Sequence, residues 1–175
     1  TRMLQLMRRG ITREKTEELL ETIREKVPGI ALRTTMIAGH PGETEGDFLH
    51  LMDFIEKARF ERLGIFQYSH EENTHAFSMP NDVPDEVKQE RADAVMELQQ
   101  EISLNINQQR IGKTLKVLVD RKEGPDYVGR SEYDSPEVDN EVIIKAPGDY
   151  LRTGDFVQVK ITGATEFDLT GEPVK

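Results

Sequence analysis

The sequence of 175 residues predicts an α/β part over residues 1–109, followed by a small antiparallel β-barrel over residues 110–175. Three observations lead to this division. Helical and strand-like patterns alternate in the first part, which is typical of parallel strands joined by crossover helices. A long helical pattern then runs to about residue 109. After Gly112, short β-like runs alternate with turns that contain Gly or Pro, as they do in small barrels.

The chain opens within a helical pattern, which the cations and glycine of Arg8-Arg9-Gly10 end. Thr12 is the expected N-cap of a second helix, which Pro28-Gly29 ends. Four apolar residues share one face of that helix at helical spacing: Leu19, Leu20, Ile23 and Val27. Because no initiator Met precedes the first helical pattern, we expect the chain to be a segment of a longer protein.

The stretch from Ile30 to Thr44 predicts a strand followed by a turn. The apolar and Thr-rich run stops at Gly39, and the Pro and Gly that follow cannot continue a strand. Thr44 with Asp47 forms an acidic variant of the capping box, and a helix follows to about Ala58. Strand, glycine turn and capped helix form one βα unit, with the turn at the strand end where α/β proteins place ligands.

The next predicted strand is Phe60–Ser69, and it is followed by a polar loop over residues 70–84. A helix from Pro84 to about residue 109 follows, whose apolar positions recur every three or four residues if one turn at Arg91 is skipped. Two strands cannot bury a sheet by themselves, so the missing strands are expected upstream. An incomplete sheet exposes an edge strand and an apolar face, which predicts association of the isolated chain.

The second part contains four β-like runs separated by turns. The runs cover residues 115–119, 127–129, 142–144 and 156–161, and the turns are Gly124-Pro125, Pro147-Gly148 and Gly154-Asp155.

Composition excludes several classes of site. The chain has no Cys, which excludes disulfides, thiolate metal sites and a thiol nucleophile. No run is long enough to span a membrane, and no signal peptide is visible. The net charge is −10, and residues 110–175 carry 10 Lys and Arg against 13 Asp and Glu, a net of −3. This balance argues against a strongly basic nucleic-acid surface and favours a basic partner.

Three features allow both a functional and a structural interpretation. The turn at Gly39–Thr44 precedes a helix N-terminus, where free amides favour an anion, yet such a turn also serves as a plain βα connection. His70 and His75 invite a zinc interpretation, but the helical zinc motif needs a spacing of four, and a polar loop facing substrate fits better. Arg33 either grips a carboxylate or lays its stem along the sheet edge with its head in water.

An ordered set of motifs resembles the radical S-adenosylmethionine (SAM) methylthiotransferases, and residues 110–175 resemble their TRAM domain, a small OB-like β-barrel. The shared motifs are Met7-Arg-Arg9, Arg33-Thr34, Gly39-x-Pro-Gly-Glu-Thr44, Phe48, Phe66-x-Tyr-Ser69, Thr74-x-Ala76 and Val83-Pro-x-Glu-Val-Lys88. The branch that modifies a ribosomal protein is the most similar, through Tyr68-Ser-x-Glu-x-x-Thr-x-Ala-Phe77, Val128-Gly-Arg130, Ser135-Pro-Glu-Val-Asp139 and Glu166-Phe-Asp168. The resemblance covers essentially the whole chain and implies that residues 1–109 are the C-terminal part of a TIM-like radical SAM barrel.

For the whole protein, this resemblance implies SAM and two 4Fe-4S clusters, cleavage of SAM to a 5′-deoxyadenosyl radical, and a cytoplasmic location. The implied reaction adds a methylthio group to the β-carbon of an aspartate in small-subunit ribosomal protein twelve. The cluster cysteines of the family lie upstream, outside this chain, so we expect the chain to be inactive alone. It would supply one wall of the SAM pocket and the domain that recognises the substrate.

The resemblance also implies site residues. Ile37 and Gly39 would border the adenosyl group of SAM, and Arg33 would meet its methionine carboxylate. Tyr68 and Ser69 would close the pocket at the next strand end. No catalytic or metal-binding residue is expected in this chain.

Three positions depart from the family pattern: His40 stands in place of the usual Phe, Asn73 in place of Gly, and Thr170 where a Trp-Gly pair is common. An acidic TRAM surface suits a basic ribosomal protein, because opposite potentials speed and orient encounter. Two alternatives stay open: a tRNA methylthiotransferase whose TRAM domain grips phosphates, and a non-enzymatic β-barrel adaptor with a helical arm.

Overall fold

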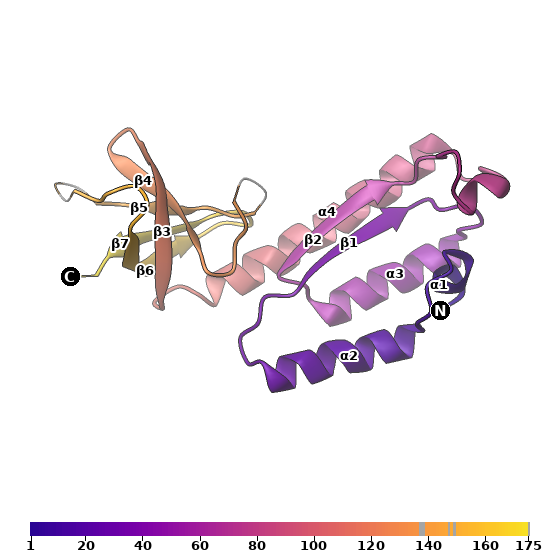
Figure 1. The fold of residues 1–175 in the computed structure, drawn as a ribbon, viewed down its shortest axis with the longest axis horizontal. Helices are drawn as coiled ribbons and strands as arrows, with labels where there is room; N and C mark the ends of the chain where they lie inside the picture. Colours follow the sequence, from indigo (N-terminus) through magenta and orange to yellow (C-terminus); the bar gives the residue numbers. More distant parts are fainter. Residues whose placement is uncertain (137–138, 147, 149, 175) are drawn as a thin grey trace. The chain divides into compact units, whose positions relative to one another are not determined.

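The structure, a computed structural model, describes residues 1–136, 139–146, 148 and 150–174. The chain divides into two compact units, residues 1–99 and 100–175, and the division falls inside helix α4 (Asp85–Gln108) (Figure 1). Each unit is described by itself below. The domain division after residue 109 stays a prediction.

The first unit confirms the predicted α/β alternation. Its other elements are α1 (Arg2–Leu6), α2 (Arg13–Lys26), β1 (Arg33–Ala38), α3 (Glu45–Ala58), β2 (Arg62–Gln67) and the short 3-10 helix η1 (Ala76–Ser78). Strands β1 and β2 pair in parallel, from Arg33 opposite Arg62 to Ala38 opposite Gln67. β2 is shorter at both ends than the strand predicted over residues 60–69, although the Tyr68 N–H still donates to the Ala38 carbonyl oxygen at 2.8 Å.

Side-chain caps explain where two helices begin: α2, which precedes β1, and α3, which precedes β2. The Thr12 hydroxyl accepts a hydrogen bond from the Lys15 N–H, which starts α2. Thr44 and Asp47 form the complete capping box that starts α3, as predicted. Helix α3 ends at Arg59, which has a left-handed backbone with φ of 46°. Because these signals are local, the sequence alone was enough to find them.

One face of the two-stranded sheet is not covered within residues 1–99. Along β1, residues Arg33, Thr35 and Ile37 are exposed in alternation with less exposed neighbours. Ile37 pairs with Phe66, and these side chains are 40% and 66% exposed. The opposite side of the sheet holds the buried Ala38, as expected if only this side is packed against helices.

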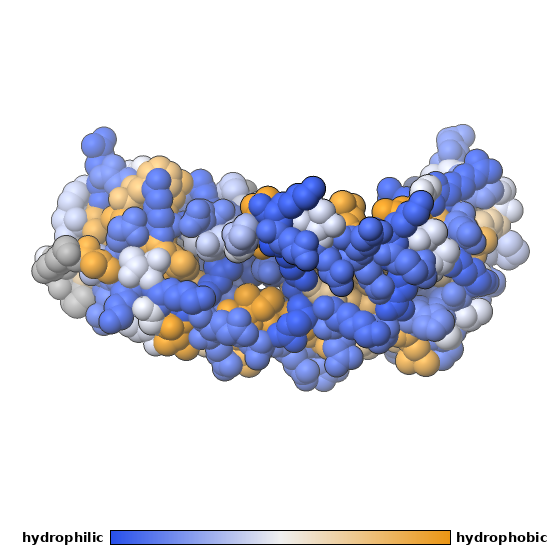
Figure 2. Space-filling view, turned by 90° about the horizontal axis from the view of Figure 1, so that it is seen from below, coloured by the Kyte–Doolittle hydropathy of each residue, from blue (hydrophilic) through white to orange (hydrophobic). Residues whose placement is uncertain are grey.

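Helix α2 contributes no buried residue to the first unit. Its apolar face, which the helical spacing predicts, stays partly open, since Leu19 and Val27 are each about half exposed. The face shown in Figure 2 is mostly hydrophilic, with separate hydrophobic patches between hydrophilic residues.

The second unit confirms the predicted barrel. Strands β3 (Thr114–Glu123), β4 (Asp126–Ser131), β5 (Val142–Ile144), β6 (Phe156–Ala164) and β7 (Leu169–Pro173) close in the order β3-β4-β5-β7-β6. Its core is built from inward-facing residues of all five strands and is led by aliphatic side chains with almost no exposure: Val117, Val119, Val142, Ile144, Val159 and Ile161.

The expectation of a wholly antiparallel barrel needs one correction. Strands β5 and β7 pair in parallel, whereas the other four pairs are antiparallel. A closed ring with an odd number of strands cannot alternate direction all the way round, so at least one neighbouring pair must run parallel. Strand β7 was also absent from the predicted runs, because its sequence Leu-Thr-Gly-Glu-Pro lacks a β-rich pattern.

The last turns of α4 belong to the second unit. The Ser103 hydroxyl donates to the Glu166 carbonyl oxygen at 2.7 Å, and the Asn107 side-chain amide donates to the Thr165 carbonyl oxygen at 2.9 Å. These bonds anchor the loop that precedes β7. The predicted motif over residues 135–139 and the turn at 147–148 lie partly outside the described residues. Among the described helices, none is both long and apolar enough to cross a membrane.

Candidate functional site

A cavity of about 400 Å³ lies in the first unit at the C-terminal ends of β1 and β2. Ile37 and His40 line it from the β1 side, and Phe66 to Ser69 line it from the β2 side. The end of α1 and the loop over residues 71–76 supply the rest of the lining. The C-terminal ends of parallel strands are where α/β proteins bind ligands.

The structure brings together three of the five site residues that the resemblance implies. Ile37, Tyr68 and Ser69 all line the cavity. Gly39 is buried in the turn next to His40 and does not line the cavity itself. Arg33 lies at the far end of β1, exposed on the same strand face as Ile37, and it has an interaction partner within the fold. Their roles in binding stay predictions.

A chain of four rings begins at the cavity, where His40 and Tyr68 belong to the lining. The rings of His40 and Tyr68 meet edge to face with centroids 5.4 Å apart, and the Tyr68 hydroxyl lies 3.0 Å from His70 Nδ1. The His70 ring in turn lies 4.6 Å from that of Phe77. Edge-to-face contacts of this kind fix ring orientation as well as burying area. The cavity therefore has an ordered aromatic side.

The turn from Gly39 to Thr44 is already occupied by carboxylates of the chain itself. The Gly39 N–H donates to Glu43 Oε1 at 3.0 Å, and the Gly42 N–H donates to Asp82 Oδ1 at 2.8 Å. The Thr44 N–H donates to Asp47 Oδ2 at 3.0 Å. A bound anion would meet these three negative charges, so the geometry favours the interpretation of this turn as a βα connection.

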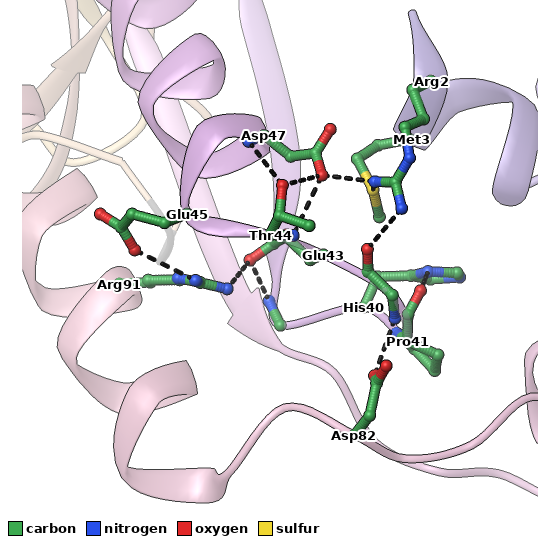
Figure 3. A network of polar contacts seen from close by, with 12 residues as sticks. Arg2, Met3, His40, Pro41, Glu43, Thr44, Glu45, Asp47, Asp82 and Arg91 are labelled. Carbon is green, nitrogen blue, oxygen red and sulfur yellow. Dashed lines mark hydrogen bonds and ion pairs between the residues drawn. The ribbon is translucent and has the colours of Figure 1, made fainter.

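Figure 3 shows how side chains from distant segments meet around this turn. Arg2 binds the Asp47 carboxylate and donates to the Gly42 carbonyl oxygen at 2.9 Å, which joins α1 to the start of α3. Desolvation raises the pKa of the Asp47 carboxyl, but hydrogen bonds from Thr44 and the charge of Arg2 outweigh it. The pKa of Asp47 therefore lies below its ordinary value.

Helix α4 supplies two buried cations to this region that sequence reasoning did not select. The Arg91 Nη1 atom donates to Glu43 Oε1 at 2.7 Å, and the Lys88 ammonium donates to Asp85 at 2.8 Å and to Asn81 at 3.2 Å. One signal was present, because Arg91 interrupts the apolar stripe of the helix at a position where an apolar residue is expected. A charged residue within an apolar stripe indicates a buried partner elsewhere in the chain.

The histidines of the loop do not form a metal centre with neighbouring acids. Among the described residues, no group of three or more His, Asp or Glu side chains is arranged to hold a metal ion. His70 instead pairs with Tyr68 and Phe77, and His75 lines the cavity. The size and the mixed aromatic and polar lining of the cavity suit a nucleoside-sized ligand.

Comparison with known proteins places the chain in context. The TRAM domain family matches residues 111–174. A ribosomal protein uS12 methylthiotransferase RimO from Cytophaga hutchinsonii is 61% identical over 173 residues, which are 99% of this chain and 40% of that protein. Proteins of the same name from Flavobacterium johnsoniae and Bacteroides fragilis are 55% and 52% identical, over 98% and 97% of this chain. The chain spans about two fifths of the length of these relatives.

The motifs at the ends of β1 and β2, the closed barrel and an alignment that covers nearly the whole chain agree with one another. With a match to the TRAM domain family at residues 111–174, the chain is similar over nearly its whole length to these methylthiotransferases.

Proposed function

We propose that the whole protein adds a methylthio group to the β-carbon of an aspartate in ribosomal protein uS12, small-subunit ribosomal protein twelve, in the cytoplasm. The observation that carries this proposal is the 61% identity over 99% of the chain to a protein named for that activity. Within it, residues 1–109 supply one wall of a SAM pocket as part of a radical SAM barrel, and residues 110–175 recognise the substrate.

The cavity at the ends of β1 and β2 fits the adenosyl part of SAM. Ile37 offers an apolar surface, and Tyr68 with His40 offers ordered rings against which a purine can pack. Gly39, buried in the turn beside His40, is proposed to border the adenosyl group, and Ser69 adds a hydroxyl to the lining. Arg33 is proposed to meet the methionine carboxylate, since a guanidinium pairs with a carboxylate through two parallel hydrogen bonds. When bound, SAM supplies the radical and methyl chemistry of the reaction.

The residues of this chain do not fit an iron–sulfur cluster. Cluster irons are held by Cys thiolates, and the chain contains none. Both 4Fe-4S clusters of the proposed enzyme are therefore held by cysteines in the rest of the protein. The chain is inactive alone and acts by binding and orienting SAM and substrate.

Charge supports a protein substrate for the barrel unit. Residues 110–175 are net negative, and three of their cations are already paired with acids: Arg121 with Glu141, Arg130 with Asp120, and Lys145 with Asp126. An RNA-binding barrel relies on cations that neutralise phosphates, whereas a basic protein is attracted to surplus acid.

The direct test uses the whole protein with both clusters reconstituted. It is incubated with SAM, a sulfur source and a reductant, together with either purified uS12 or a tRNA anticodon stem-loop. We expect uS12 to gain the mass of a methylthio group on one aspartate, with the RNA unchanged. Modification of the RNA alone, or RNA binding that weakens steeply with salt, would move the assignment to the tRNA-modifying branch.

A separate test addresses Arg33. Replacing Arg33 with Ala in the whole protein is expected to weaken SAM binding by about tenfold to a hundredfold, since a charged hydrogen-bond pair contributes on the order of 1.5–3 kcal/mol. Unchanged SAM affinity would remove Arg33 from the site.

A further inference from the structure

A buried ion pair joins helix α4 to the turn beside the cavity. Glu43 Oε1 accepts one hydrogen bond from the Gly39 N–H at 3.0 Å and another from Arg91 Nη1 at 2.7 Å. The side chains of Glu43 and Arg91 are only 4% and 8% exposed. One oxygen atom therefore ties the first residue of the turn to a helix that begins more than 40 residues later in the chain.

Lys88 holds the same turn from a second point. It lies one helical turn before Arg91, on the same face of α4. A Cβ on Gly39 would stand 2.2 Å from Lys88 Cγ, so the Lys88 stem packs against the backbone of Gly39. The Lys88 ammonium also lies 5.7 Å from the centre of the Tyr68 ring. Two neighbouring residues of α4 thus contact both strand ends that border the cavity.

The second acidic partner of Arg91, Glu45, is exposed to solvent, whereas Glu43 is buried. Arg91 Nη2 lies 3.2 Å from Glu45 Oε2, but the Glu45 side chain is 71% exposed. A solvent-exposed pair contributes little, whereas removing one partner of a buried pair leaves a charge without compensation. Glu43 and Glu45 therefore form a natural comparison, with the same cation and the same chemical group but different burial.

A buried pair is weak support for net stability, because desolvation of both charges opposes their attraction. Its firm consequence is geometric, since both hydrogen bonds to Glu43 Oε1 form only when the turn and α4 hold one relative position. His40, which lines the cavity, directly follows Gly39 in the turn.

We propose that Glu43 and Arg91 are positioning residues for the cavity, which fix the turn at Gly39 and His40 so that α4 sets the affinity for the adenosyl ligand. They act through the turn and do not touch the ligand. This inference rests on the proposed function of the cavity as part of a SAM site.

The experiment measures SAM binding by the whole protein at equilibrium, together with KM for SAM and kcat. Glu43→Ala is expected to raise Kd and KM for SAM by about tenfold, since misplaced binding groups on this scale cost one to two orders of magnitude. The kcat value at saturating SAM should fall far less, because the reacting groups lie elsewhere. The matched control is Glu45→Gln, for which Kd should stay within about twofold of the unaltered protein.

A readout without ligand is available in the 175-residue chain. Hydrogen exchange of the Gly39 amide should speed up in Glu43→Ala and stay unchanged in Glu45→Gln, because only Glu43 accepts from that amide. If Glu43 only stabilised the fold, Glu43→Ala would instead speed hydrogen exchange throughout residues 1–99.

The outcomes separate the two proposals. If the unaltered whole protein does not bind SAM, the proposed function of the cavity fails. The positioning role is refuted if the unaltered protein binds SAM and Glu43→Ala has the same Kd and KM. Thermal unfolding must first show that this variant is folded. If Glu43→Ala does not fold, Glu43→Gln replaces it in the test, because the Gln side chain has nearly the shape of Glu without its charge. A raised Kd for SAM then supports the role of the pair, and an unchanged Kd overturns it.

Discussion

Replacing Gly39 with Ala tests how tightly the turn is held. The backbone of Gly39 has φ of +76°, and an added Cβ would lie 2.2 Å from Lys88 Cγ and 3.1 Å from Lys88 Cβ and Cδ. A left-handed backbone costs a residue with a side chain about 1–2 kcal/mol. Forcing the buried Lys88 stem aside adds about 1–3 kcal/mol. We therefore expect Gly39→Ala to destabilise residues 1–99 by about 2–5 kcal/mol.

Gly29→Ala is the matched control. Gly29 has φ of +81°, but nothing lies within 4 Å of its added Cβ. This variant shows the backbone cost alone, expected to be about 1–2 kcal/mol. The difference between the two variants is the contribution of the contact with Lys88.

The assay is urea unfolding of the 175-residue chain, followed by hydrogen exchange at the amides of β1. Amides of β6 in the barrel serve as an internal reference that neither variant should change. A cycle with Lys88→Ala completes the test, because trimming the stem should remove most of the extra cost of Gly39→Ala. Equal destabilisation by Gly39→Ala and Gly29→Ala would refute the close packing of Lys88 on the turn.

Two further predictions concern other parts of the chain. Gly129→Ala would bring a Cβ to 2.3 Å from the Leu118 carbonyl oxygen. We expect thermal unfolding to show that the barrel loses at least about 2 kcal/mol of stability. The control is Gly163→Ala, whose added Cβ has its nearest atom at 3.7 Å and which should change stability little. Asp47 has a lowered pKa in the fold, so its contribution to stability should be complete above about pH 4, the unfolded value, and be lost as pH falls through the folded pKa. Asp47→Asn should make the unfolding free energy less dependent on pH over that acidic range. If the unaltered protein and the variant showed the same pH dependence, the contribution of Asp47 would be contradicted.

Helix boundaries were readable because their causes are local. Thr12 and Thr44 each cap the helix that follows through a backbone N–H three residues away, which any sequence window contains. The glycine turn after β1 was predicted for the same reason, since positive φ at Gly39 and Gly42 suits Gly and few other residues. The resemblance of the motifs implied a shared site for Ile37, Tyr68 and Ser69; all three line one cavity in the fold, and their role in binding stays a prediction.

Strand β7 could not be found from its own residues. Gly171 occurs there because its missing side chain admits the Lys160 carbonyl oxygen, which would lie 2.6 Å from a Cβ. Pro173 likewise pairs opposite Val159 despite its lack of an N–H. The partners of this strand therefore decide its conformation more than its propensity does.

The sequence by itself determined the order and type of most elements, the caps of α2 and α3, and the glycine turn after β1. Tertiary structure alone decided the parallel pairing of β5 with β7 and the meeting of Glu43 with Arg91. The reason is physical: helix capping and turn formation depend on neighbours within a few residues. Closure of an odd-stranded barrel and compensation of a buried charge depend on groups that only the folded chain brings together.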